Sequence, residues 1–224
     1  MGLPQTIVFD LDGTLVDTAP DLTAALNVAL AAVERPAIDP ATVRHLVGHG
    51  ARALIDRGLA VSGGSGEDEI SRALPAFLTY YAAHIADGSR PYPKVEAAMD
   101  ALAAAGVRLA ICTNKPVALA AALIAALGWT DRFGAVLGGD SLDVRKPNPA
   151  PLLAAIAEAG GDPATTLYVG DTSVDVATAR AAGVPVIVVA FGYADHPVTS
   201  LGADAVLEDF ADLVAVASRL DEPA

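Results

Sequence analysis

Short runs of apolar residues recur along the chain, and within each run the hydrophobicity is continuous rather than alternating. Continuous runs are typical of parallel strands that are covered on both faces of a sheet. Helical stretches separate the runs; one of them carries Leu119, Leu123 and Leu127 on a single stripe. This alternation predicts an α/β fold with a doubly wound, parallel, Rossmann-like sheet. The predicted strands are Thr6–Phe9, Val107–Cys112, Ala135–Leu137, Thr166–Val169 and Val186–Ala190.

One region contains helical signals only. Leu22, Leu26 and Leu30 form an apolar stripe, and "TAPD" at 18–21 resembles a capping box at its start. Further helices are predicted over 40–46, 51–59 and 67–84. We therefore expect a helical cap domain, residues 17–86, inserted after the first strand. The α/β core then consists of residues 1–16 and 87–224.

Composition narrows the possible locations. No apolar stretch is long enough to span a bilayer, and "MGLPQTIVFD" lacks the pattern of a signal peptide. Cys112 is the only cysteine, which excludes an internal disulfide and suits a reducing compartment. We expect a soluble cytoplasmic protein without a membrane partner, either a monomer or a homodimer.

Charge narrows the possible partners. The net charge of the 224 residues is −13, and lysine and arginine form no cluster. Nucleic acid is therefore excluded as an expected partner, because its binding needs basic residues against the phosphates. A small phosphorylated metabolite remains possible, provided that a metal ion or a few placed cations hold it.

Polar residues follow the predicted strands where each strand ends. Because ligands of open α/β sheets bind at the carboxyl ends of the strands, these residues are the candidate site. Asp10 and Asp12 are two residues apart in an extended segment, so both can face one side. The other candidates are Thr113 and Asn114 after the second strand, Lys146 after the third, and Asp171 with Asp175 after the fourth.

Several carboxylates in one pocket repel one another. Two unit charges about 4 Å apart cost roughly 4 kcal/mol at an effective dielectric near 20. A hard divalent cation offsets this cost, and Mg²⁺ held by carboxylates and a substrate phosphate is a common arrangement. A carboxylate beside Mg²⁺ can attack a phosphoryl group, with Asp12 as acid and base. Thr113 and Asn114 can donate hydrogen bonds to phosphoryl oxygens, and Lys146 can neutralise charge there.

Four segments resemble the motifs of the haloacid dehalogenase-like phosphohydrolases, in order: "FDLDGTLVDT", "ICTNK", "RKPNPAP" and "VGDTSVDVATARAAG". The resemblance covers nearly the whole chain. It implies that Asp10 is the nucleophile and Asp12 the acid/base, and that Thr113 and Lys146 bind the phosphoryl group, where Asn114 is the further donor argued above. It also implies Mg²⁺ ligands, which are Asp10, Asp12, Asp171 and Asp175.

Two softer segments, 47–59 and 191–213, look most like bacterial phosphoglycolate phosphatases. They imply a phosphomonoesterase that converts 2-phosphoglycolate to glycolate and phosphate through an aspartyl-phosphate. A sugar-phosphate mutase or a broad-range sugar phosphatase of the same superfamily shares the core residues and remains an alternative. A phosphorylated switch is disfavoured by the helical insert and by the early "DLDGT", although Asp140 and Asp143 follow the third strand.

The cap offers few cations for the organic part of a substrate. It contains no lysine, which argues against a phosphonate hydrolase that forms a Schiff base on a cap lysine. Arg52, beside "GHG" at 48–50, is the candidate contact to a substrate carboxylate, although a solvated helix arginine explains it equally well. Lys115 rivals Lys146 as the cation of the core, but the "RKP" segment favours Lys146.

Overall fold

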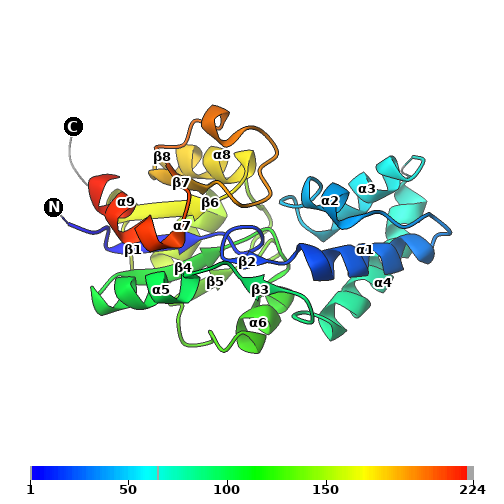
Figure 1. Ribbon diagram of the computed structural model, residues 1–224, viewed down its shortest axis with the longest axis horizontal. Coiled ribbons are helices and arrows are strands. Elements are labelled where there is room, and N and C mark those ends of the chain that lie inside the picture. Colours follow the sequence, from blue (N-terminus) through cyan, green and yellow to red (C-terminus); the bar gives the residue numbers. More distant parts are fainter. Residues whose placement is uncertain (1, 65, 221–224) are drawn as a thin grey trace.

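The computed structural model describes residues 2–64 and 66–220, and a six-stranded sheet lies at its centre (Figure 1). Neighbouring strands run parallel in the order β5-β4-β1-β6-β7-β8. This sheet confirms the predicted doubly wound α/β class. Its strands are β1 (Thr6–Phe9), β4 (Arg108–Cys112), β5 (Ala135–Leu137), β6 (Thr166–Gly170), β7 (Val186–Val189) and β8 (Ala205–Leu207).

Helices cover both faces of the sheet, and this explains the continuous hydrophobicity of its strands. They are α5 (Val95–Ala104), α6 (Val117–Ala126), α7 (Ala150–Glu158), α8 (Ser173–Ala182) and α9 (Leu213–Leu220). Along β1, Ile7 and Phe9 pack into one core with α5, α6 and α9. Val8 packs into a second core with α7 and α8. Central strands that are buried on both sides are therefore mostly apolar along their length.

The helical insert packs as one group to the right of the sheet in Figure 1. Its helices are α1 (Ala19–Ala31), α2 (Pro40–Arg44), α3 (Ala51–Val61) and α4 (Glu67–Ala83). Leu26, Ile55 and Phe77 are buried in the hydrophobic cluster that joins these helices. Short 3-10 turns elsewhere are η1 (Pro163–Thr165), η2 (Val198–Ser200) and η3 (Phe210–Asp212).

Three short strands have no counterpart in the sequence prediction. β2 (Val16–Asp17) and β3 (Arg90–Pro91) form an antiparallel pair where the chain enters and leaves the helical insert. β8 adds a sixth strand at one edge of the main sheet. β2 and β3 have two residues each, too few to carry a hydrophobic pattern. β8 has the same Ala-Val-Leu sequence as the predicted strand β5, and the sequence prediction missed it.

The expected capping box at the start of α1 is wrong. Thr18 occupies the N-cap position, but its side chain makes no capping hydrogen bond. The carboxylate of Asp21 instead accepts hydrogen bonds from the backbone N–H groups of Gly88 and Ser89, at 2.8 and 2.7 Å. The Ser89 hydroxyl donates to it as well, at 2.6 Å. Asp21 thus ties the first helix of the insert to the segment that returns to the sheet.

The described part of the chain holds no helix with both the length and the apolar character needed to cross a bilayer.

Candidate active site

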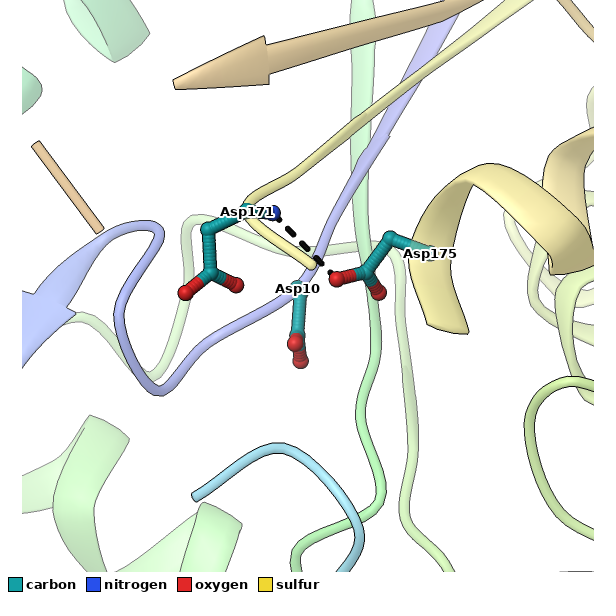
Figure 2. Close-up of side chains that lie close together, drawn as sticks. All are labelled: Asp10, Asp171 and Asp175. Carbon is teal, nitrogen blue, oxygen red and sulfur yellow. Dashed lines mark hydrogen bonds between the residues drawn. The ribbon is translucent and has the colours of Figure 1, made fainter. Parts of the chain in front are cut away.

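Three of the predicted carboxylates come together at the carboxyl edge of the sheet. Asp10 follows β1, Asp171 follows β6, and Asp175 lies in the first turn of α8. Each offers an oxygen, and these oxygens lie within 4.8 Å of one another. In Figure 2 the three side chains point toward a common space. β1 and β6 are paired directly, with Phe9 opposite Val169, so the residues that follow them are neighbours.

Backbone features hold Asp171 in this place. Its carboxylate accepts hydrogen bonds from the backbone N–H of Tyr193 at 2.7 Å and from the Thr14 hydroxyl at 3.1 Å. Gly13 adopts a φ of +82°, and a Cβ atom there would lie 2.2 Å from Asp171 Oδ2. Only glycine allows both the left-handed backbone and this close approach. The glycine of the "DLDGT" segment therefore makes room for the third carboxylate.

Asp175 is held by the turn that begins α8. Its Oδ2 accepts hydrogen bonds from the Thr172 hydroxyl at 2.7 Å and from the backbone N–H groups of Thr172 at 3.0 Å and Asp171 at 3.2 Å. Figure 2 marks the last of these as a dashed line. Asp175 therefore supports the helix start, and its other oxygen, Oδ1, accepts hydrogen bonds from Lys146 Nζ at 2.7 Å and from the Tyr168 hydroxyl at 2.9 Å.

Lys146 supplies the positive charge beside these carboxylates. Its Nζ lies 2.7 Å from Asp175 Oδ1 and 3.2 Å from Asp10 Oδ2, and it donates to the Tyr168 hydroxyl at 2.8 Å. The side chain is buried, and it comes from the segment between β5 and α7. One ammonium group therefore contacts two of the three carboxyl groups, so its single charge cannot balance the charge of all three if they are ionised.

The crowding of negative charge and the burial of the site shift the pKa values of the three carboxyl groups in different directions. Burial raises the pKa of Asp10 to about 6 against the opposing effect of Lys146. Burial, with Asp175 and Asp10 nearby, raises the pKa of Asp171 well above its usual range. Burial also disfavours the charged form of Asp175, but the Lys146 ammonium and hydrogen bonds from Lys146 and Thr172 hold its pKa below the usual range. A cluster of hard oxygen donors with unbalanced negative charge fits a divalent cation such as Mg²⁺.

Asp12 lies beside this cluster and has a different partner. Both oxygens of its carboxylate contact Lys115 Nζ, at 2.9 and 3.2 Å. Lys115 also donates to the hydroxyl of Tyr81 at 2.5 Å, and Tyr81 belongs to α4 of the helical insert. Both lysines that the sequence offers as the core cation therefore lie at the site. Lys146 contacts Asp10, and Lys115 contacts Asp12.

A pocket with about 440 Å³ of empty space opens over these residues. Its floor comes from the sheet edge, where Asp10 and Asp12 meet Thr113 and Asn114. Its walls include apolar side chains of the insert and of α6, which exclude water from part of the space. These wall residues are Leu22, Val47, Leu54, Phe77, Tyr81 and Leu119.

Of the remaining candidates from the sequence, two line the pocket and one does not. Thr113 lines the pocket floor. Asn114 also lines it, but its Nδ2 group donates to the backbone carbonyls of Gly48 at 3.1 Å and Lys146 at 3.2 Å. Arg52 is not among the lining residues; it forms an ion pair with Glu67 on the exposed side of the insert.

Comparison with known proteins places the chain among hydrolases. The family model of the haloacid dehalogenase-like hydrolases matches residues 4–183. The phosphoglycolate phosphatase of Rhodospirillum rubrum is 47% identical over 216 residues, which cover 94% of this chain and 90% of that protein. The phosphoglycolate phosphatase of Mesorhizobium japonicum is 49% identical over 216 residues, with coverage of 96% and 95%. A solved structure of a predicted phosphoglycolate phosphatase from Haemophilus somnus superposes with a TM-score of 0.89 at 35% identity, and covers 95% of this chain and 97% of that one.

The carboxylate cluster predicts how pH acts on the stability of the metal-free protein. A carboxyl group whose pKa is raised on folding binds more protons in the folded state than in the unfolded state, so stability falls as pH rises between the two pKa values. For Asp10 this window runs from its ordinary value of 3.8 to about 6. Raising the pH from 4.5 to 7.5 should remove on the order of 2–3 kcal/mol at this cluster. Mg²⁺ should restore stability at pH 7.5 and much less at pH 4.5.

Thermal unfolding of the wild-type protein and of Asp171→Asn, with and without Mg²⁺, measures this effect. The variant loses one carboxylate and keeps an oxygen that accepts from Tyr193. It should therefore show a weaker fall in melting temperature with pH and a smaller gain from Mg²⁺. Identical pH and Mg²⁺ responses in the two proteins would contradict the description of the cluster.

Proposed function

The chain belongs to the haloacid dehalogenase-like hydrolases, and from this membership we propose that it is an Mg²⁺-dependent phosphatase that converts 2-phosphoglycolate to glycolate and phosphate. The observation that carries the proposal is the group of buried carboxylates of Asp10, Asp171 and Asp175, beside a pocket that Asp10 and Asp12 help to line. The names of the relatives at 47% and 49% identity support this substrate in particular.

The proposed reaction has two steps at Asp10. In the first, a carboxylate oxygen of Asp10 bonds to phosphorus, the bond from phosphorus to the ester oxygen breaks, and Asp12 gives a proton to the leaving glycolate oxygen. In the second, a water molecule attacks phosphorus and gives its proton to Asp12, and the bond from phosphorus to Asp10 breaks. The backbone N–H of Leu11 donates to Asp10 Oδ1 at 2.7 Å and so restricts the orientation of the nucleophile.

Three residues of the core are proposed to bind the transferred phosphoryl group. Lys146 Nζ lies 3.2 Å from Asp10 Oδ2. Its positive charge is therefore close to the oxygens of a phosphoryl group that is bonded to Asp10. Thr113 lines the pocket on the same side. Asn114 lines it too, but its Nδ2 group must release the Gly48 carbonyl before it can donate to a phosphoryl oxygen.

The proposed metal ligands are Asp10, Asp171 and Asp175. Their buried oxygens are hard donors of the kind that Mg²⁺ prefers, and their charge exceeds that of Lys146. A bound Mg²⁺ would offset the negative charge of the carboxylates and of the phosphoryl oxygens. Asp12, which the resemblance gave as a fourth ligand, does not belong to this group of three, and its carboxylate contacts Lys115; we propose it here as the acid/base.

We further propose that residues 17–86 act as a cap on a core made of residues 1–16 and 87–224. The four helices of this segment share one hydrophobic cluster, and the segment supplies most of the apolar walls of the pocket. The chain enters and leaves the segment through the β2–β3 pair. A cap of this kind shields a reactive phosphoryl group from bulk water.

Substrate preference tests the proposal directly. The purified protein should release phosphate from 2-phosphoglycolate faster than from a panel of sugar phosphates and nucleotides, and chelation of Mg²⁺ should abolish the release. Slow release of phosphate from many members of the panel would support the phosphatase mechanism but refute 2-phosphoglycolate as the preferred substrate. The protein would then be a broad-range sugar phosphatase. Conversion of a sugar phosphate to its isomer without net phosphate release would instead indicate a mutase.

Substitution of the nucleophile tests the mechanism. Asp10→Asn should lower kcat by more than about 10³-fold, since an amide oxygen is a poor nucleophile. The variant should unfold at the wild-type temperature or above it without metal, because one of the repelling charges is removed. Asp143→Asn, at an exposed position after β5, is the matched control and should keep wild-type turnover. Near-normal activity of Asp10→Asn would refute the assigned nucleophile.

A further inference from the structure

The proposed function needs a cation for the carboxylate end of the substrate, and the structure offers one in the pocket. Among the lining residues in the described part of the chain, Lys115 carries the only positively charged side chain. Lys146 is buried beside Asp10, where Asp175 and the Tyr168 hydroxyl hold its ammonium group. Arg52 is paired with Glu67 away from the pocket.

Lys115 is held in a fixed position at the boundary between core and insert. Its side chain is 2% exposed, and its Nζ contacts both oxygens of Asp12 and the hydroxyl of Tyr81. The ammonium also lies 4.4 Å from the centre of the Tyr81 ring, a distance at which a cation is attracted to the aromatic face. A buried lysine that is ordered in this way binds an anion with little further loss of side-chain entropy.

The distances suit a short substrate. In the proposed reaction Asp12 contacts the ester oxygen, and Lys115 Nζ lies 2.9 Å from Asp12 Oδ1. The carboxylate carbon of 2-phosphoglycolate is two bonds from that ester oxygen. A carboxylate at this position therefore reaches Lys115 while the phosphoryl group stays at Asp10. An ester whose acid group is several atoms further away would place its charge beyond this lysine.

We propose that Lys115 is the residue that selects the substrate: its ammonium binds the carboxylate of a 2-phosphoryloxy acid, with Tyr81 as the positioning residue. The inference rests on the proposed function. On binding, the substrate carboxylate takes the place of Asp12 as the partner of Lys115. Asp12 is then free to contact the leaving oxygen. The ammonium of Lys115 would thus both bind the substrate carboxylate and let go of Asp12, the acid/base.

Two esters of equal carbon number test this role, 2-phosphoglycolate and ethyl phosphate, of which only the first carries a carboxylate. In Lys115→Met, kcat/KM for 2-phosphoglycolate should fall by roughly 10- to 100-fold more than kcat/KM for ethyl phosphate, the size expected for a hydrogen bond to a charged group. Much of the loss should appear in KM. Lys94→Met is the matched control, since Lys94 is half-exposed and pairs with Asp209 outside the pocket. It should keep the wild-type preference.

Lys115→Gln guards against loss of folding, because glutamine keeps an N–H donor for Asp12 without the charge. It should lose the preference in the same way. If either folded Lys115 variant keeps the wild-type ratio between the two esters, or loses both activities equally, the inference is overturned and the proposed function stands. If the wild-type protein itself shows no preference for 2-phosphoglycolate, the proposed substrate fails first, and the inference fails with it.

Discussion

Mutual repulsion among three buried carboxyl groups is the constraint on which the rest of this structure depends. Asp10, Asp171 and Asp175 share one small space, and Lys146 offsets only part of their charge. Such a group costs free energy in the absence of a cation, so it persists only where the surrounding backbone holds it in place. Hydrogen bonds to Asp171 and Asp175 provide this support, and Gly13, which has no side chain, allows the carboxylate of Asp171 to lie against the backbone. A divalent cation bound among the three carboxylates would offset this cost.

The sheet makes this concentration of charge possible. β1 lies between β4 and β6, is paired in register with both, and is covered on each face by helices. The charged side chains of the candidate site therefore gather at the carboxyl edge, where β1 and β6 end beside each other. The helical insert covers that edge with apolar walls, and Tyr81 reaches down to Lys115. The charged groups of the sheet edge lie under the apolar side chains of the insert. Electrostatic interactions between these groups are strong, because the apolar surroundings have a low dielectric constant.

Features that depend on local pattern were predictable from the sequence, and features that depend on distant partners were not. The main strands and helices were found because burial on two faces imposes a continuous apolar run. Arg52 seemed the best cation of the insert by position, yet Glu67, fifteen residues along the chain, holds it elsewhere. The contacts of Lys115 with Asp12 and Tyr81 join residues 103 and 34 positions apart, and no periodicity encodes them. Asp21 likewise bonds to Ser89 instead of capping its own helix.

The central claim is that the three carboxylates are tolerated together because they bind a divalent cation. Crystals grown with Mn²⁺ in place of Mg²⁺ test it most directly, since the anomalous signal of Mn²⁺ locates the ion independently of the protein model. The account predicts one strong peak between Asp10, Asp171 and Asp175, at about 2.0–2.2 Å from their oxygens. A peak elsewhere, or none at this position at saturating Mn²⁺, would contradict it.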